Sequence, residues 1–221
     1  EALKKHIEFM ADVTDAPIFM DGPTPSIRSE AAKFAGEIGI EDQIVYNSIE
    51  SSTKEVDKEI EAIQESGINS AVLLSIDTTD MSIDGRRNAL EANLEVAEEA
   101  GIDQPIVDPG IIDIPDSGYV AKIIHELKNE YGIPMGCAPH NEVIQWEMND
   151  PLTENSRQLR QAVANSVIAI LGADFNIYGP LHGAPEMYEV MSTADAYVAY
   201  GAQMGENRRA DTDHPLFKIF R

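Results

Sequence analysis

Short apolar segments alternate along the chain with longer segments in which apolar and polar residues follow a helical period. The short segments are residues 18–20, 44–46, 71–74, 106–107, 133–135 and 175–178. Each leads into a polar or Gly- or Pro-containing turn, which is typical of a buried strand that precedes a helix. The helical period is clearest where Val120, Ile123, Ile124 and Leu127 share one face. The pattern predicts six successive strand–helix units.

A glycine stands at the end of five predicted helices, just before the next strand. These residues are Gly39, Gly67, Gly101, Gly132 and Gly172. Glycine is favoured there because the left-handed conformation that ends a helix is costly for residues with a side chain. Successive glycines are 28, 34, 31 and 40 residues apart, which is the length of a βα unit. The spacing supports the same alternating architecture.

Alternating strands and helices imply a parallel sheet covered by helices, either an open doubly wound sheet or a (β/α)8 TIM barrel. No G-x-G-x-x-G or P-loop pattern follows any predicted strand, so the open nucleotide-binding sheet lacks its main signal. A barrel needs eight units, whereas the chain has six and begins at Glu1 inside a predicted helix. We therefore expect a single barrel domain over residues 1–221 whose first two βα units are missing.

The charge of the chain is strongly negative. Asp and Glu number 39 against 16 Lys and Arg, which gives a formal charge of −23. Such a surface repels nucleic-acid phosphates and anionic lipids, so neither is expected as a partner. The acidity suits a solvated surface in high salt or a docking face for a basic partner. A single cysteine, Cys137, and the lack of an apolar run of about 20 residues fit a cytoplasmic protein.

Chemistry in a barrel is located at the carboxyl ends of the strands. Those positions hold Asp21, Asn47, Ser75, Asp77, Asp108, His140, Asn141 and Tyr178. No lysine or G-x-S-x-G turn is among them, which argues against Schiff-base or serine-nucleophile chemistry. Carboxylates and carboxamides instead suit the amidine edge of a flat heterocycle such as a pterin, with adjacent N–H donors.

Two other interpretations of these residues remain open. Asp21 and Asn47 could serve only as turn residues, which is a common role for Asp and Asn. His140, His182, Asp21 and Asp108 could form a mixed metal site, but no H-x-H or H-x-x-x-H pair supports it, so no metal is expected. His140 itself is expected to be a structural residue.

The chain resembles the family of H subunits of tetrahydromethanopterin S-methyltransferase along nearly its whole length. The segments that carry the resemblance are Phe9-Met-Ala-Asp-Val-Thr-Asp-Ala-Pro17, Phe19-Met-Asp-Gly22, Tyr46-Asn-Ser-Ile49, Ile106-Val-Asp108, Pro134-Met-Gly-Cys137 with Asn141, Gly172-Ala-Asp-Phe175 with Tyr178-Gly-Pro180, and His214-Pro-Leu-Phe-Lys-Ile-Phe220. The family is similar to other pterin-binding methyltransferase barrels.

The resemblance implies an enzyme that moves a methyl group between N5 of a reduced, tetrahydromethanopterin-like pterin and the cobalt of a corrinoid. It also implies that a partner protein or subunit carries the corrinoid, within a membrane methyltransferase complex approached from the cytoplasm, and that the chain is a homodimer. Matched motif by motif, Asp21, Asn47 and Asp108 correspond to pterin-binding residues. Asn141 corresponds to the asparagine near N5 and is expected to be catalytic.

Two other functions fit part of the same pattern. A dihydropteroate-synthase-like enzyme would need basic or hydroxyl groups for a diphosphate at the strand ends. The only candidates are Arg86 and Arg87, which are expected at an exposed helix start. A non-catalytic scaffold subunit of a methyltransferase complex is the other alternative, although the retained acids and amides argue against it.

Overall fold

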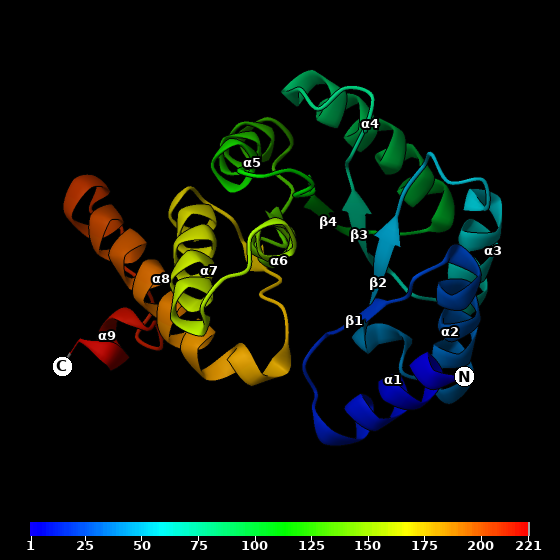
Figure 1. Ribbon diagram of the computed structural model, residues 1–221. Coiled ribbons are helices and arrows are strands. Elements are labelled where there is room, and N and C mark those ends of the chain that lie inside the picture. Colours follow the sequence, from blue (N-terminus) through cyan, green and yellow to red (C-terminus); the bar gives the residue numbers. More distant parts are fainter. Residues whose placement is uncertain (221) are drawn as a thin grey trace. The chain divides into compact units, whose positions relative to one another are not determined.

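The computed structural model describes residues 1–220 and divides into two compact units, Glu1–Asp108 (unit 1) and Pro109–Arg221 (unit 2). Each unit has its own sheet, with four strands in unit 1 and two in unit 2, and all strand pairs are parallel (Figure 1). The chain is therefore a mixed α/β protein with parallel sheets, as the alternation of apolar segments predicts.

Unit 1 carries a parallel sheet in which the strand order β1-β2-β3-β4 follows the sequence. Its elements are α1 (Ala2–Val13), β1 (Ile18–Asp21), α2 (Pro25–Ile38), the short 3-10 turn η1 (Glu41–Gln43), β2 (Ile44–Ile49), α3 (Val56–Ser66), β3 (Ser70–Leu74), α4 (Ile83–Ala100) and β4 (Gln104–Asp108). Helices α1, α2, α3 and α4 pack in a row, each against the next (Figure 1). Every crossover thus joins neighbouring strands.

The two faces of this sheet differ. Side chains of a strand alternate between faces, so Met20 and Tyr46 lie on one face while Phe19 and Asp21 lie on the other. Met20 and Tyr46 are fully buried, and the Tyr46 hydroxyl reaches Glu59 on α3, so theirs is the face that the helices cover. Phe19 is 39% exposed and Asp21 is exposed. The second face therefore remains open within unit 1 near the end of β1.

Local sequence explains where the helices begin and end. Thr24 and Ser82 precede α2 and α4, and their hydroxyls accept the backbone N–H of Ile27 and Gly85. The predicted helix-ending glycines are confirmed: four are C-caps with positive φ, and Gly172 follows the cap of α7 with φ 109°. Gly36 is needed for a different reason, because it lets α2 approach the end of α3 closely. An added β-carbon would lie 2.6 Å from the Ser66 carbonyl oxygen.

Unit 2 has a short sheet and longer helices. Its elements are α5 (Ser117–Tyr131), β5 (Gly136–Cys137), α6 (His140–Asn149), α7 (Glu154–Ile170), β6 (Phe175–Asn176), the 3-10 turn η2 (Leu181–Gly183), α8 (Ala184–Glu206) and α9 (Leu216–Ile219). Strands β5 and β6 pair in parallel. The predicted apolar face of α5 is confirmed, because Val120, Ile123, Ile124 and Leu127 are all fully buried.

The fifth strand lies later in the chain than the sequence predicts. The expectation of a strand at residues 133–135 is wrong for residues 133 and 134, since β5 comprises Gly136–Cys137 and only Met135 before it takes part in a bridge. Pro134 has no N–H to donate, and the N–H of Met135 donates instead to the Asp174 carboxylate at 2.9 Å. The ladder begins at Gly136, where any β-carbon would collide with the Phe175 carbonyl oxygen.

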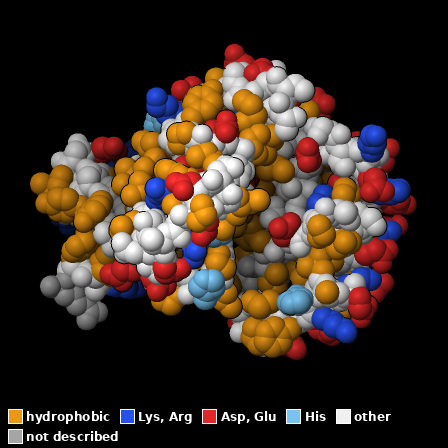
Figure 2. Space-filling model, viewed as in Figure 1, with side chains coloured by type: hydrophobic (Ala, Val, Ile, Leu, Met, Phe, Trp, Pro, Cys, Tyr) orange, Lys and Arg blue, Asp and Glu red, His pale blue; other side chains and the backbone are white. Residues whose placement is uncertain are grey.

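Charged side chains are scattered over the surface of both units. Figure 2 shows many carboxylates with a smaller number of Lys and Arg side chains among them. Some of the basic side chains are paired at 2.6–2.7 Å, as in Lys33–Glu65, Lys58–Glu55 and Lys128–Asp174. Exposed pairs of this kind contribute little to stability. Within residues 1–220, no helix is both long enough and apolar enough to cross a bilayer.

Candidate functional site

Asp21 and Asn47 end up side by side at the carboxyl edge of the unit 1 sheet. Asp21 is the last residue of β1, and it is the register partner of Asn47 in β2. Partners in neighbouring parallel strands point to the same face, with the strands about 4.8 Å apart. Both side chains therefore lie on the face opposite the helices. Asp21 is exposed and Asn47 is half-buried, so both are accessible to a ligand.

Asp108 lies at the same edge, at the end of β4. Its register partner in β3 is Leu74. Val72 is the partner of Asn47 and precedes Leu74 by two positions, so Asp108 shares the face that holds Asn47. The Asp108 carbonyl accepts the N–H of the fully buried Ser75 at 2.8 Å, which extends the ladder past the end of β3. Asp108 itself is 7% exposed. The sheet thus brings Asp21, Asn47 and Asp108 to one edge and one face.

A bulge alters β2 just beyond Asn47. Asn47 and Ile49 pair with the consecutive residues Val72 and Leu73, so Ser48 is the extra residue. The peptide bond between Asn47 and Ser48 is cis. A bulge interrupts the alternation of side chains and redirects those that follow it. Asn47 is therefore the last residue of β2 that keeps the regular register with β1 and β3.

Asn93 holds the loops at this edge, and no sequence pattern singles it out. Its side chain on α4 is 1% exposed, and Nδ2 donates to the Leu74 carbonyl at 2.9 Å. Its Oδ1 accepts the N–H of Ser51 at 2.7 Å. A cleft of about 430 Å³ lies beside it, lined by the loops that follow β2 and β3. An asparagine within a helix carries no signal of such a bridge, because both partners are backbone groups distant in sequence.

Asp77, another predicted strand-end acid, serves its own loop. The backbone and hydroxyl of Thr79 both donate to Asp77 Oδ1, at 2.8 and 2.6 Å. These hydrogen bonds hold the pKa of the Asp77 carboxyl below its usual value. Asp77 is therefore a turn residue in this structure.

Arg86 is buried, so the expectation of an exposed position at the helix start is wrong for this residue. Its side chain on α4 is fully buried. Arg86 lies on the same helical face as Leu90, Asn93 and Ala97, all of which are buried, because positions three and four apart in a helix are neighbours. The neighbouring Arg87 is partly exposed and bonds to Asp84 one turn earlier.

In unit 2, His140 and Asn141 open α6, directly after the strand β5. Asn141 is exposed. His140 is half-buried, with Nδ1 2.8 Å from Nε2 of Gln161. Its ring packs against Gly179, where a β-carbon would come within 2.5 Å of it. Burial, and secondarily Arg157, lowers the pKa of His140, so the imidazole is neutral at neutral pH. These contacts support a structural role for His140.

Glu142 fixes the start of α6 relative to α5, although nothing in the sequence pattern indicates this contact. The side chain is 6% exposed, and its Oε2 accepts the backbone N–H groups of Asp116 and Ser117 at 3.0 and 2.6 Å. A carboxylate at a helix N-terminus is stabilised by the unpaired N–H groups and the helix dipole. Glu142 therefore anchors the turn of helix that contains Asn141.

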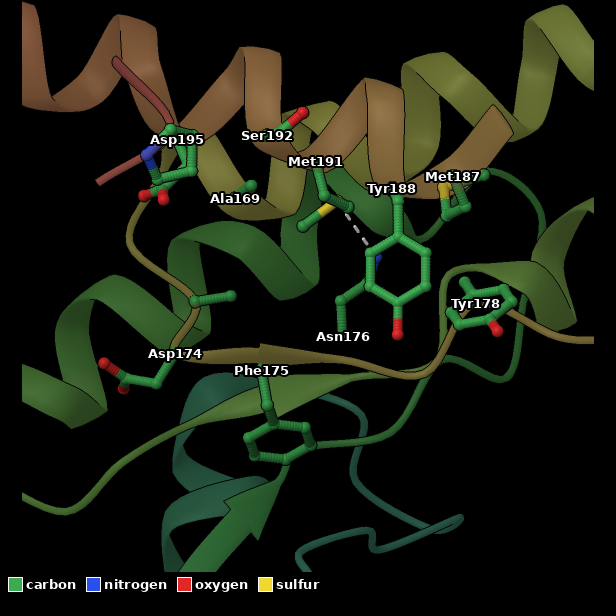
Figure 3. Close-up of a pocket in the computed structure, with 12 residues that line it drawn as sticks. Ala169, Asp174, Phe175, Asn176, Tyr178, Met187, Tyr188, Met191, Ser192 and Asp195 are labelled. Atoms are coloured by element: carbon green, nitrogen blue, oxygen red, sulfur yellow. Dashed lines mark hydrogen bonds between the residues drawn. The ribbon is translucent and has the colours of Figure 1, made fainter. Parts of the chain in front are cut away.

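A cavity of about 450 Å³ lies in unit 2, between β6 and α8 (Figure 3). Asn176 and Met191 both line it and are in contact, with Asn176 Nδ2 donating to the Met191 sulfur at 3.3 Å. None of Asp21, Asn47, Asp108 and Asn141 lines this cavity. Among residues 1–220, no group of three or more His, Cys, Asp or Glu side chains is arranged to hold a metal ion.

Comparison with known proteins points to one family. A sequence model described as "Tetrahydromethanopterin S-methyltransferase MtrH subunit" matches residues 1–207. The H subunit of tetrahydromethanopterin S-methyltransferase from Methanopyrus kandleri is 32% identical over 220 residues, covering 90% of this chain and 68% of that protein. The protein of the same name from Methanothermobacter thermautotrophicus is 30% identical over an alignment of 234 residues, covering 99% and 74%. Its counterpart in Methanocaldococcus jannaschii is 31% identical over an alignment of 243 residues, again covering 99% and 74%.

Proposed function

This chain belongs to the MtrH family of tetrahydromethanopterin S-methyltransferase subunits, and from that membership we propose that it binds a reduced pterin and takes part in transferring its methyl group. The acceptor or donor on the other side is the cobalt of a corrinoid carried by a partner protein or subunit. The observation that supports a pterin site most directly is the convergence of Asp21, Asn47 and Asp108 on one face and one edge of the sheet.

We propose a (β/α)8 barrel as the complete architecture, with residues 1–221 forming one domain of it and two further βα units completing the ring. The strand order β1-β2-β3-β4 follows the sequence without reversal, and α2 and α3 cover one face only of the first two strands. A doubly wound sheet would reverse its strand order and cover both faces with helices. A barrel wall has the order and the one-sided cover seen in unit 1.

The three side chains suit the edge of a pterin. The ring presents an amino group beside a ring N–H, and a carboxylate accepts both donors at once. Asp21 and Asp108 take this role, while Asn47 both donates and accepts and so suits a ring nitrogen or carbonyl. Placement on strand ends, rather than on a long loop, fixes such contacts precisely.

Asn141 is assigned to N5 of the pterin. The corrinoid of the partner supplies the cobalt centre that exchanges the methyl group. When the bond between N5 and the methyl carbon breaks, its electron pair stays on N5, which must be stabilised. Asn141 hydrogen-bonds to N5, and water or a carboxylic acid supplies the proton, because a carboxamide does not ionise at neutral pH. Assistance of this kind typically contributes about 10²–10⁴-fold in rate.

The relatives are named as H subunits of a methyltransferase, which supports assembly with other subunits. We place this chain at the cytoplasmic side of such a complex, in contact with the corrinoid-carrying subunit, and as a homodimer. The formal charge of −23 disfavours direct contact with anionic lipid. Attachment through another protein is therefore the expected mode of association.

Titration with reduced pterins tests the proposal. Tetrahydromethanopterin, tetrahydrosarcinapterin and tetrahydrofolate would each be added to the protein by isothermal titration calorimetry. Methyl transfer from the methylated form of each to free cob(I)alamin would be followed by absorbance. Saturable binding together with formation of methylcobalamin supports the enzyme. Binding without transfer would favour the scaffold subunit, and absence of binding to all three would contradict the pterin site.

A further inference from the structure

Behind the edge that holds Asp21 and Asn47 lies a buried polar cluster formed by Arg28, Tyr46 and Glu59. One carboxylate oxygen, Glu59 Oε1, accepts three hydrogen bonds. They come from the Tyr46 hydroxyl at 2.5 Å and from Arg28 Nε and Nη2 at 3.1 and 2.7 Å. Tyr46 is fully buried, and the side chains of Glu59 and Arg28 are 2% and 11% exposed. The cluster joins α2, α3 and β2.

Two members of the cluster, Arg28 and Tyr46, are connected to the backbone next to the predicted pterin ligands. Arg28 Nη1 donates to the Gly22 carbonyl at 2.9 Å, and Gly22 directly follows Asp21. Tyr46 directly precedes Asn47 in β2. Because neighbouring residues of a strand point to opposite faces, the cluster lies on the helix side and the ligands lie on the other. The contacts therefore fix the backbone at both ligand positions without occupying the ligand face.

The pKa values of two members of the cluster, Tyr46 and Arg28, are shifted by their surroundings. Burial, together with the hydrogen bond to Glu59, raises the pKa of Tyr46, so its hydroxyl remains a donor. Burial alone would lower the pKa of Arg28, but the charge and hydrogen bonds of Glu59 outweigh it and raise that pKa. Glu59 Oε2 is buried without a hydrogen-bond partner among residues 1–220. The donors on Oε1 thus provide the hydrogen bonds that this carboxylate receives from the described part of the chain.

We propose that Arg28, Tyr46 and Glu59 are positioning residues for the pterin site, a role that rests on the proposed function. They set the relative placement of Asp21 and Asn47 through Gly22 and the β2 backbone. A buried ion pair contributes little net stability compared with apolar packing. A stabilising role alone therefore does not explain why Arg28 and Glu59 are paired in this buried position. Binding groups require placement within about 0.5 Å, and fixed neighbours supply it.

Tyr46→Phe tests this role with the smallest change, because it removes one hydroxyl and keeps the ring. We expect the dissociation constant of tetrahydromethanopterin, measured by calorimetry on the full chain, to rise about tenfold, which corresponds to about 1.4 kcal/mol. The matched control is Ile63→Val, which trims a residue of α3 that is 1% exposed and lies outside the cluster. Melting temperatures of both variants are recorded, and the control is expected to bind the pterin as the unmodified chain does.

A double variant separates positioning from stability. If Tyr46 acts through Asn47, Tyr46→Phe should have no further effect on pterin affinity once Asn47→Ala has removed the ligand side chain. A loss of melting temperature should still appear in the Asn47→Ala background, because the hydroxyl contact with Glu59 is removed in both backgrounds.

Each outcome bears on the proposal in a distinct way. Equal losses of affinity from Tyr46→Phe with and without Asn47→Ala would overturn positioning through Asn47. Unchanged affinity in Tyr46→Phe, with Asn47→Ala weakened, would also overturn it while leaving the pterin site intact. Unchanged affinity in Asn47→Ala would contradict the proposed site itself, and the positioning role would then fail with it.

Discussion

The two units of this protein present their candidate functional residues in contrasting ways. In unit 1, Asp21, Asn47 and Asp108 lie on a parallel sheet of four strands, whose register is regular up to the bulge that follows Asn47. In unit 2 the strands are only two residues long, and Asn141 stands exposed at the start of a helix. Under the proposed function, unit 1 would contribute the residues that bind the ring, and unit 2 would contribute Asn141, the residue assigned to N5.

The two units also differ in which side chains they expose and which they bury. Most of the large apolar side chains that are exposed belong to unit 2, chiefly on α7, α8 and α9. Unit 1 exposes fewer such side chains, and it buries polar groups behind its sheet in the cluster of Arg28, Tyr46 and Glu59 and in the bridge made by Asn93. In unit 1, buried hydrogen bonds therefore help to hold the strand ends and the loops that follow them in place.

The largest expected effect is on rate, and it comes from unit 2. Asn141→Ala should lower kcat for methyl transfer about 100-fold or more and leave the pterin dissociation constant within about twofold, because the lost contact strengthens as the C–N bond breaks. Stopped-flow absorbance and calorimetry measure the two quantities. Asn149→Ala, an exposed asparagine at the other end of α6, is the control. An equal fall in affinity and rate would contradict the catalytic role proposed for Asn141.

Asp108→Ala should weaken pterin binding, whereas Asn141→Ala should lower the rate of methyl transfer. Loss of a charge-assisted hydrogen bond costs about 1.5–3 kcal/mol, so the pterin dissociation constant should rise about 10- to 100-fold. The control is Asp103→Ala, an exposed acid that precedes the opposite end of β4. Calorimetry showing the same affinity for both variants would exclude Asp108 from the ligand site.

Glycine substitutions probe how tightly each unit is packed. Gly36→Ala should destabilise unit 1 by about 1–3 kcal/mol, because its β-carbon would meet the Ser66 carbonyl of α3. Gly201→Ala in α8 meets nothing within 4 Å and should instead stabilise unit 2 by about 0.5–1 kcal/mol. Urea denaturation measures both. Similar losses of stability from the two substitutions would show that the close packing of α2 against α3 is not the reason why Gly36→Ala destabilises unit 1.

The smallest expected effect depends on pH and lies in unit 2. Hydrogen bonds from Arg157, joined by its charge, lower the pKa of Glu147 below its ordinary value. A carboxyl with a lowered pKa in the folded state stabilises the fold above its unfolded pKa of about 4.3, and this contribution is lost as the pH falls through the lower folded value. Glu147→Gln should therefore narrow the difference between melting temperatures at pH 7 and pH 3. If the difference between the two melting temperatures is unchanged, the pair of Glu147 and Arg157 does not contribute to the pH dependence of stability.

The sequence predicted the local features of the fold well, because each depends on nearby residues. Helix-ending glycines have positive φ, as at Gly39 and Gly67, and the apolar face of α5 is buried. The fifth strand was predicted too early, because the apolar character of residues 133–135 does not compensate for the missing N–H of Pro134. Strand pairing, unlike apolar character, depends on hydrogen bonds to a distant segment.

Prediction of the site was more limited for the same reason. The strand-end pattern identified Asp21, Asn47 and Asp108, and the register of the sheet places them on one face. Nothing in the sequence indicated that Glu59 binds Arg28 and Tyr46, since these residues are separated by 31 and 13 positions. The burial of Arg86 is not predictable from its position, because charged residues near a helix start are usually exposed.

The central claim is that acidic side chains at the carboxyl edge of unit 1 hold the pterin. Its most direct test is the dissociation constant of tetrahydromethanopterin for the double variant Asp21→Asn and Asp108→Asn, which removes both charges and preserves side-chain shape. If both carboxylates hold the pterin, the dissociation constant should rise at least about 100-fold, with a melting temperature within a few degrees of that of the unmodified chain. The same dissociation constant in both proteins would contradict this claim.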